Sequence, residues 1–323
     1  MVKFIHVIKT NIHSGIHGRH PYNKAGDGPE GVELRITTEW LHHNFSNCII
    51  KRIIYNEKSS LYRNGTSQKG DKQLINYFPL QIEGVTCKGK HIIWICKTLN
   101  NGETIYFHNH LAMTGRWCLT KGNNSNLELV ILKGETEQSL FFDDIRRFGD
   151  FSVQYSLDEL TEKIKEVGID LMDVSIKYYC YKDKQLLIDT QKSWLNHFNK
   201  LNSNNRSRKR EIYPILMEQK YFAGLGNYLS CELLFECKIS PQRKIMDLNS
   251  QEIVNIFNKA IELLYCSYRY GGLTIKDFWD PEGKIGKFPR KVYGHDKDPN
   301  GYDVIKTKFS NGRTCQWVRE VQL

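Results

Sequence analysis

The hydrophobic pattern divides the chain into a region of short strands followed by a region of helices. Apolar residues recur at helical spacing in "GVELRITTEWLHHNF" (31–45), which predicts an amphipathic helix. Short apolar runs between polar turns are typical of strands, and strands at this spacing predict a β-sandwich or barrel. These runs lie at 48–55, 91–99, 104–113, 127–134 and 139–145.

From about residue 156 the apolar residues recur with the period of a helix. Ser156 and Glu159 have the spacing of a capping box, and 211–239 reads as helix, glycine turn and helix. A further amphipathic helix is predicted over 250–272, and 301–322 alternates like a hairpin around Asn311–Gly312. The predicted fold is therefore α+β, with an N-terminal β-sandwich domain, a C-terminal helical domain and a terminal β-hairpin.

The composition points to a polyanionic partner. The 323 residues include 46 Lys and Arg against 36 Asp and Glu, a formal charge of +10, which favours nucleic acid or a membrane surface. No apolar run approaches the length of a membrane span, so no membrane insertion is expected. The nine cysteines contain no C-x-x-C pair, which favours a reducing compartment and argues against a four-cysteine zinc site.

The segment 1–28 holds four histidines and few acidic residues. A poorly ordered basic tail is the favoured interpretation, over a histidine metal site. An organelle presequence is also compatible with this composition.

The stretch "AGLGNYLS" (223–230) lies between two predicted helices. Gly224 and Gly226 let the backbone turn tightly and approach a ligand closely. Asn227 begins the next helix, whose N-terminal N–H groups and dipole attract a phosphate. A plain helix–helix turn explains the same residues equally well.

Two further stretches, "HLAMTGRW" (110–117) and "DDIRRFGDF" (143–151), end strand-like runs. They supply Met113, Arg147 and Phe148, the side-chain types that enter a duplex where a base has been displaced. Core packing is the alternative for Met113 and Phe148. Lys90, just before an apolar strand, has the position of a snorkelling surface residue. Arg313 near the hairpin turn is well suited to binding a phosphate, or is a solvated loop residue.

Six segments follow one another in a defined order along the chain. Together they resemble the formamidopyrimidine-DNA glycosylase / endonuclease VIII (Fpg/Nei) family over about residues 29–323. The segments are "PEGVE" (29–33), "KGKHIIW" (88–94), "HLAMTGRW" (110–117), "DDIRRFG" (143–149), the helix–two-turn–helix at 217–243 and the loop region at 271–294. The four finger cysteines are absent, and "NGRTCQW" (311–317) resembles the zincless finger of the plant and giant-virus branch.

The resemblance implies a bifunctional DNA glycosylase with AP lyase activity in base-excision repair. Such an enzyme removes oxidised bases from damaged double-stranded DNA and cuts the strand through a Schiff base by β- or β,δ-elimination. It implies Pro29 as nucleophile and Glu30 as its acid/base partner, with no cofactor and no metal. The other implied residues are Glu33 and Lys90 in catalysis, His110, Asn227 and Arg313 on DNA, and Met113, Arg147 and Phe148 in the void left by the extruded base.

The resemblance also implies the organisation of the chain, as a monomer. We expect an extension at 1–28, a catalytic β-sandwich domain at 29–175, a helix–two-turn–helix DNA-binding domain at 190–290 and a zincless hairpin finger at 291–323. The base-contacting loop near 271–290 gives no indication of the lesion, oxidised purine or oxidised pyrimidine. Nucleus, virus factory and organelle all stay open as the compartment.

One departure from the family concerns the nucleophile. Pro29 follows Gly28, and its nitrogen is therefore part of a tertiary amide with no useful nucleophilicity. Three explanations are open: a start assigned too far upstream, cleavage after Gly28, or another amine such as that of Lys90. The alternative function is a non-catalytic relative that binds damaged DNA, and a basic β/α protein with chance motifs is the third hypothesis.

Overall fold

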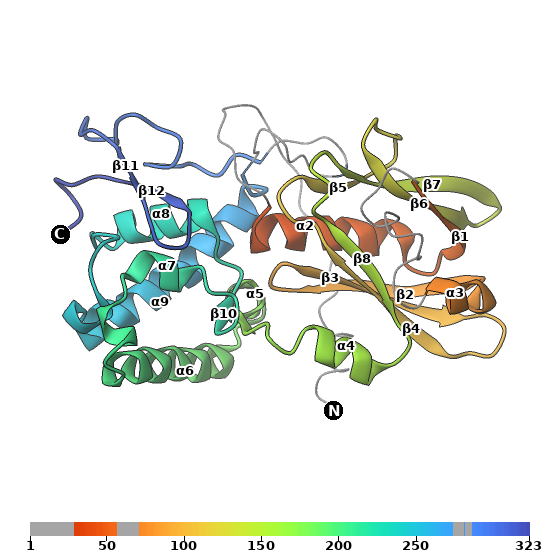
Figure 1. The fold of residues 1–323 in the computed structure, drawn as a ribbon, viewed down its shortest axis with the longest axis horizontal. Helices are drawn as coiled ribbons and strands as arrows, with labels where there is room; N and C mark the ends of the chain where they lie inside the picture. Colours follow the sequence, from red (N-terminus) through yellow and green to blue (C-terminus); the bar gives the residue numbers. More distant parts are fainter. Residues whose placement is uncertain (1–28, 57–70, 274–280, 282–285) are drawn as a thin grey trace.

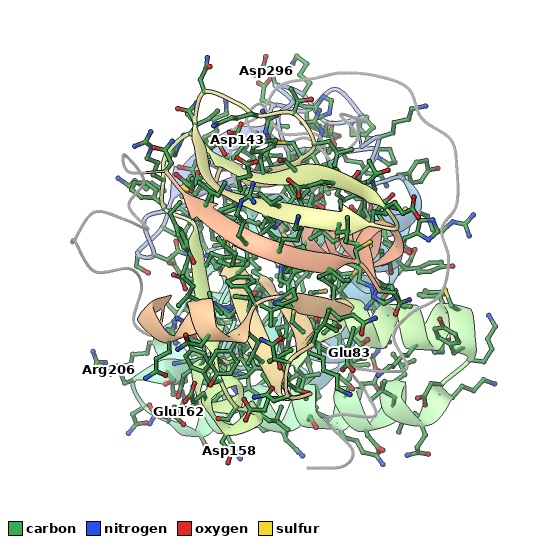
Figure 2. The ribbon with its side chains drawn as sticks, turned by 90° about the vertical axis from the view of Figure 1, so that its right-hand side faces the viewer. Glu83, Asp143, Asp158, Glu162, Arg206 and Asp296 are labelled. Carbon is green, nitrogen blue, oxygen red and sulfur yellow. The ribbon has the colours of Figure 1, made fainter. Side chains whose placement is uncertain are left out.

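A computed structural model describes residues 29–56, 71–273, 281 and 286–323 (Figure 1). Helix α2 (Gly31–Phe45) follows Pro29 directly, which confirms the first predicted helix. Its side chains Val32, Leu34, Leu41 and Phe45 are buried in the main core. Figure 1 shows α2 between strands β5–β7, above it in the view, and strands β2–β4, below it, and Figure 2 shows the sheet region from the side. The predicted extension at 1–28 lies outside the described residues.

An eight-stranded antiparallel sheet forms the N-terminal part, in the order β5-β7-β6-β1-β2-β3-β4-β8. All five predicted runs are strands, but the pattern missed β2, β5 and β8. In β2 a register shift near Gly84 interrupts the alternation, and β5 has only four residues. The strands are β1 (Ile49–Tyr55), β2 (Leu80–Lys88), β3 (His91–Thr98), β4 (Thr104–His110), β5 (Gly115–Cys118), β6 (Ser125–Lys133), β7 (Thr136–Asp144) and β8 (Asp150–Gln154), with α3 (Asp71–Leu74) and η1 (Ile75–Tyr77) before β2.

The C-terminal part is helical. The Ser156 hydroxyl accepts a hydrogen bond from the Glu159 N–H at 3.2 Å, which confirms the predicted start of α4. The predicted boundary at residue 175 falls inside α5, which packs against α6 and α9. The elements are α4 (Leu157–Lys163), β9 (Ile169–Asp170), α5 (Leu171–Tyr181), α6 (Lys184–Ser203), η2 (Ser207–Lys209), α7 (Ile212–Leu216), β10 (Phe222–Ala223), α8 (Asn227–Glu236), η3 (Ile245–Asp247) and α9 (Ser250–Arg269). None of the described helices is both long and apolar enough to cross a membrane.

The predicted terminal hairpin is present as β11 (Ile305–Lys308) and β12 (Thr314–Trp317). Its connection spans 309–313, longer than the predicted two-residue turn, and the Phe309 N–H donates to the Arg313 carbonyl at 2.9 Å. The hairpin packs on α8, where the Sγ atoms of Cys231 and Cys315 lie 3.6 Å apart. All nine cysteines are free thiols, and four of them are buried, as expected for small apolar residues.

Candidate active site

Two carboxylates meet at the first turn of α2. Glu30 precedes the helix in an extended conformation, and its N–H donates to Glu33 Oε2 at 2.9 Å. Both side chains are about 1% exposed. Burying a carboxylate is costly unless its oxygens accept hydrogen bonds. The groups that donate to Glu30 and Glu33 therefore determine how the two carboxylates are held.

Glu30 is held by the helical part of the chain. The Tyr228 N–H, in the first turn of α8, donates to Glu30 Oε1 at 2.9 Å. Glycines permit this approach: a Cβ at Gly226 would lie 2.2 Å from Glu30 Cδ, and a Cβ at Gly31 would lie 2.6 Å from Gly224 Cα. The sequence predicted that the α8 N-terminus attracts a phosphate. At least one of its N–H groups instead binds a carboxylate of the protein.

Glu33 receives hydrogen bonds from two distant segments. Its Oε1 accepts from the Leu273 N–H at 2.8 Å and from the Tyr228 hydroxyl at 2.9 Å. Burial raises the pKa of Glu33, while these donors and the Glu30 N–H lower it. Burial and the two carboxylates raise the pKa of Tyr228 well above its usual value, so the phenol keeps its proton and donates. Sequence reasoning missed Tyr228, which also contacts Ser267 Oγ at 3.0 Å.

Lys90 lies in the turn between β2 and β3 and is half-buried. The Gly89 N–H just before it donates to Asp170 Oδ2 at 2.7 Å. His110 ends β4, in register with His91. The Ala112 N–H donates to His110 Nδ1 at 3.3 Å, so in the neutral ring the hydrogen is on Nε2. Burial, then the charges of His108 and Lys90, lower the pKa of His110, which makes it a neutral N–H donor.

The loops that carry Met113 and Phe148 are tied together by Asp144. This buried carboxylate accepts from the Thr114 hydroxyl, from the Arg146 N–H at 3.2 Å and from the Gly149 N–H at 2.7 Å. These contacts join the segment before β5, which carries Met113, to the segment after β7, which carries Phe148. This role of Asp144 could not be predicted, because no sequence motif marks a carboxylate that holds two loops together.

Phe148 is 68% exposed, an unusual position for a large aromatic side chain. Core packing is therefore excluded as its role. Met113 is half-buried, and its Sδ accepts from Arg146 Nη1 at 3.5 Å. Arg147 has a left-handed backbone with φ 56°, which is uncommon for a residue other than glycine. An apolar side chain and an aromatic ring thus lie on loops joined by Asp144.

Asn227 and Arg313 belong to elements that pack together. Asn227 is half-buried at the start of α8, and its Oδ1 accepts from the Tyr213 hydroxyl. Arg313 is exposed in the hairpin connection, and its N–H donates to Asn311 Oδ1 at 3.1 Å. Because the hairpin packs against α8, Asn227 and Arg313 lie on one structural unit. This arrangement suits contacts of both residues with a single extended ligand.

Within the described residues, no group of three or more His, Cys, Asp or Glu side chains has a geometry that could hold a metal ion. The metal-free hairpin remains a prediction. Much of the loop near 271–290, expected to contact the extruded base, lies outside the described residues.

Comparison with known proteins gives two family matches. The "Formamidopyrimidine-DNA glycosylase N-terminal domain" matches residues 28–151, and the "Formamidopyrimidine-DNA glycosylase H2TH domain" matches 191–278. A formamidopyrimidine-DNA glycosylase of Listeria monocytogenes is 29% identical over 250 residues, 75% of this chain and 82% of the relative. One of Rickettsia bellii is 26% identical over 302 residues, 91% of this chain and 99% of the relative.

Solved structures show the same fold. The MutM (Fpg) protein of Thermus thermophilus superposes with a TM-score of 0.72 at 23% identity, covering 91% of this chain and 98% of that one. A Lactococcus lactis Fpg mutant in complex with DNA that contains Fapy-dG superposes with a TM-score of 0.71 at 22% identity, covering 91% and 99%. These likenesses confirm the predicted α+β architecture.

Proposed function

This chain belongs to the formamidopyrimidine-DNA glycosylase / endonuclease VIII family, and we propose on this premise that it is a base-excision-repair glycosylase with AP lyase activity. Its substrate would be damaged double-stranded DNA that contains an oxidised base, bound by the chain as a monomer. One observation carries the proposal: the buried pair Glu30 and Glu33 beside Pro29, held against the α8 N-terminus.

The chemistry requires Pro29 as a free secondary amine. An α-amino group titrates at about 7.7–8.0, so part of it is neutral and nucleophilic near pH 7. The amine attacks C1′, the damaged base leaves with its bonding electrons and a proton, and a cationic iminium joins Pro29 to the opened sugar. Glu30 donates the proton that the sugar ring oxygen needs when the ring opens.

Strand cleavage then follows from the iminium. The cation acidifies the C2′ hydrogen, and removal of that proton expels the 3′-phosphate by β-elimination. Lys90 is suited to contact a phosphate and to act as general acid. Glu33 accepts the Glu30 N–H and thereby fixes the backbone beside the amine.

DNA binding is expected to depend on the net charge, on three side chains that bind phosphates and on three side chains that fill the void. The net charge of +10 supplies sequence-independent attraction to phosphates. The neutral His110 donates to a phosphate oxygen, and Asn227 and Arg313 bind phosphates beside the extruded nucleotide. The loops with Met113, Arg147 and Phe148 fill the void in the duplex.

The exposed arginine of the hairpin is expected to contribute one phosphate contact. Arg313→Ala should weaken binding to abasic-site DNA and reduce the salt slope, log Kd against log[salt], by about 0.9. Fluorescence anisotropy over a series of salt concentrations measures both. Arg319→Ala is the matched control, because Arg319 is exposed but lies beyond β12. Equal slopes for wild type and Arg313→Ala would remove this arginine from the DNA interface.

The exposed aromatic side chain of Phe148 is expected to contribute to base extrusion but not to the stability of the fold. Phe148→Ala should leave the melting temperature nearly unchanged, since 68% of the residue is exposed, and should lower kcat/KM on a duplex substrate. Phe142→Ala is the matched control, because Phe142 is fully buried and its loss should cost about 3–5 kcal/mol. Unaltered kcat/KM for Phe148→Ala would exclude a role in filling the void.

The proposal is tested with duplexes that carry a single oxidised purine, a single oxidised pyrimidine or an abasic site. A protein that begins at Pro29 should release the base and cut the strand on at least one oxidised duplex. The non-catalytic alternative is favoured by the amide bond of Pro29 to Gly28. It predicts tight binding to all three duplexes with no cleavage by either form of the protein.

A further inference from the structure

We propose that Asp170 is a positioning residue for Lys90, because its carboxylate joins the turn that carries Lys90 to the start of the helical part of the chain. This inference rests on the proposed function, in which Lys90 contacts DNA at the reacting nucleotide. Neither the family matches nor the relatives assign a role to Asp170. The residue touches no reacting atom in this scheme and acts through the backbone of its neighbours.

The two oxygens of Asp170 serve different segments. Oδ1 accepts from the Met172 N–H at 2.9 Å and from the Asp173 N–H at 3.3 Å, which caps the N-terminus of α5. Oδ2 accepts from the Gly89 N–H at 2.7 Å, across the boundary between the sheet and the helices. A carboxylate is required, because both oxygens must accept at the same time.

The turn beside Lys90 has little room to move. Gly89 has φ 58°, a conformation that favours glycine, and a Cβ there would lie 2.7 Å from the Ala223 Cβ and 3.2 Å from Val167 Cγ1. The Gly89 backbone is therefore packed against β10 and against the segment before β9. The bond to Asp170 Oδ2 fixes this packed turn, and with it the start of the Lys90 side chain.

Asp170 also lies next to the segment that holds Glu30. It pairs with Ala223 in the parallel strands β9 and β10. Directly after β10, the Gly224 carbonyl accepts from the Gly31 N–H at 3.1 Å, one residue after Glu30. One short pair of strands thus sets the position of the Lys90 turn on one side and of the catalytic carboxylate on the other.

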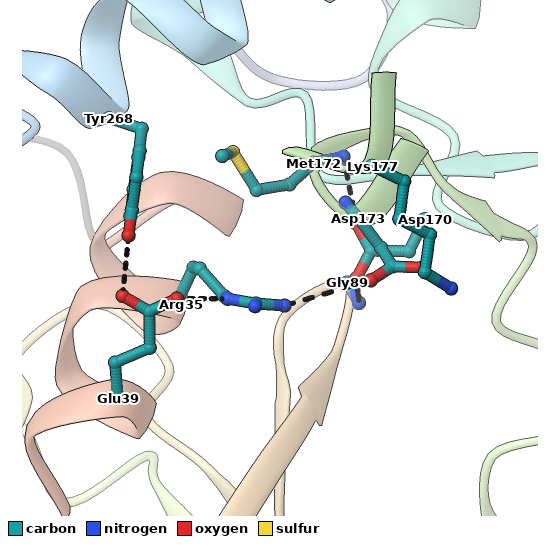
Figure 3. Close-up of polar contacts among 8 residues, drawn as sticks. All are labelled: Arg35, Glu39, Gly89, Asp170, Met172, Asp173, Lys177 and Tyr268. Atoms are coloured by element: carbon teal, nitrogen blue, oxygen red, sulfur yellow. Dashed lines mark hydrogen bonds and ion pairs between the residues drawn. The ribbon is translucent and has the colours of Figure 1, made fainter. Parts of the chain in front are cut away.

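Figure 3 shows that side chains of α2 and α9 hold the first turn of α5 in place. Arg35 Nε donates to Glu39 Oε1 at 2.6 Å, and its Nη1 lies 3.7 Å from Asp173 Oδ1. The Tyr268 hydroxyl donates to Glu39 Oε2 at 2.7 Å. Because α2 carries Glu30 at its start, this network fixes α5, and therefore Asp170, relative to the catalytic helix.

The test is Asp170→Asn in protein that begins at Pro29. The amide oxygen of Asn can still cap α5, but its NH₂ would face the Gly89 N–H with no acceptor. We expect a kcat for cleavage of abasic-site DNA lowered about 10- to 100-fold, as for a misplacement of about 1 Å, with Kd within about 2-fold of wild type. Asp183→Asn is the matched control, because Asp183 caps α6 by accepting from the Leu186 N–H alone and should leave kcat unchanged.

A Lys90→Ala background separates positioning from a general structural effect. If Asp170 acts through Lys90, Asp170→Asn should cause no further loss of kcat in Lys90→Ala protein. The same fold loss in both backgrounds would overturn the proposal, as would a wild-type kcat for Asp170→Asn.

Failure of the proposed function gives a different result. If wild-type protein that begins at Pro29 neither cuts abasic-site DNA nor forms a borohydride-trapped complex, the function itself is wrong. If it does both and Asp170→Asn behaves like Asp183→Asn, only the role of Asp170 is wrong.

Discussion

Protein that begins at Pro29 will form a borohydride-stable complex with abasic-site DNA, whereas the 323-residue chain will not. The reason is the bonding of one nitrogen. In the 323-residue chain the Pro29 nitrogen belongs to the peptide bond with Gly28, and its lone pair is delocalised into the carbonyl. In the shorter protein the same atom is a secondary amine, which forms an iminium that borohydride reduces to a permanent cross-link.

The surroundings of Pro29 support this expectation. α2 begins at Gly31, and Glu30 and Glu33 are buried beside it with hydrogen-bond donors arranged around both carboxylates. The family match to the N-terminal domain begins at residue 28, directly before Pro29. A buried acidic pair at this position has a chemical use if a reactive amine lies next to it.

The experiment compares both proteins by denaturing electrophoresis after reduction, and mass spectrometry identifies the cross-linked peptide. The N-terminal residue of the protein purified from its natural source shows whether processing or a later start creates the amine. A cross-link on Lys90 in both proteins would assign the nucleophile to the lysine. Equal trapping by both proteins that survives Pro29→Ala would contradict the role of Pro29.

Local patterns were sufficient for much of the fold. The helix at 31–45 and the hairpin at 305–317 follow from apolar periodicity and turn residues, which act over a few positions. The strand at 80–88 was missed because Glu83 and Gly84 interrupt its apolar run, where the structure has a register shift. A bulge of this kind changes which side chains point inward, and alternation along the sequence then fails.

The site was predictable only where residues act in a motif. Glu30 and Glu33 lie within one helical turn, so their pairing could be anticipated. Tyr228 reaches Glu33 across 195 positions, and Leu273 reaches it across 240. No spacing rule covers such contacts, because tertiary packing alone creates them. Asp144 and Asp170 were missed for the same reason, since each accepts a hydrogen bond from a residue far away in the sequence. Asp144 accepts from the Thr114 hydroxyl, and Asp170 accepts from the Gly89 N–H.

Substitution of the proposed acid/base residue should separate base removal from strand cleavage. In Glu30→Gln the amide oxygen can still accept from the Tyr228 N–H, so the contact with α8 is retained. The side chain can no longer transfer a proton, which should lower the rate of base removal from oxidised-base DNA by about 10²–10⁴-fold. A pre-formed abasic site needs no base removal, and its open-chain aldehyde can react with the Pro29 amine directly.

We therefore expect Glu30→Gln protein that begins at Pro29 to be trapped on abasic-site DNA but to act poorly on the oxidised base. The measurement is the ratio of single-turnover rates on the two duplexes. Glu232→Gln is the matched control, because Glu232 is a buried glutamate like Glu30 but lies on α8. It accepts hydrogen bonds from three backbone N–H groups, those of Lys291, Val292 and Tyr293. That variant should lose stability without changing the ratio. Equal loss on both duplexes by Glu30→Gln would mean that Glu30 serves the amine or the fold, and that another group protonates the sugar oxygen.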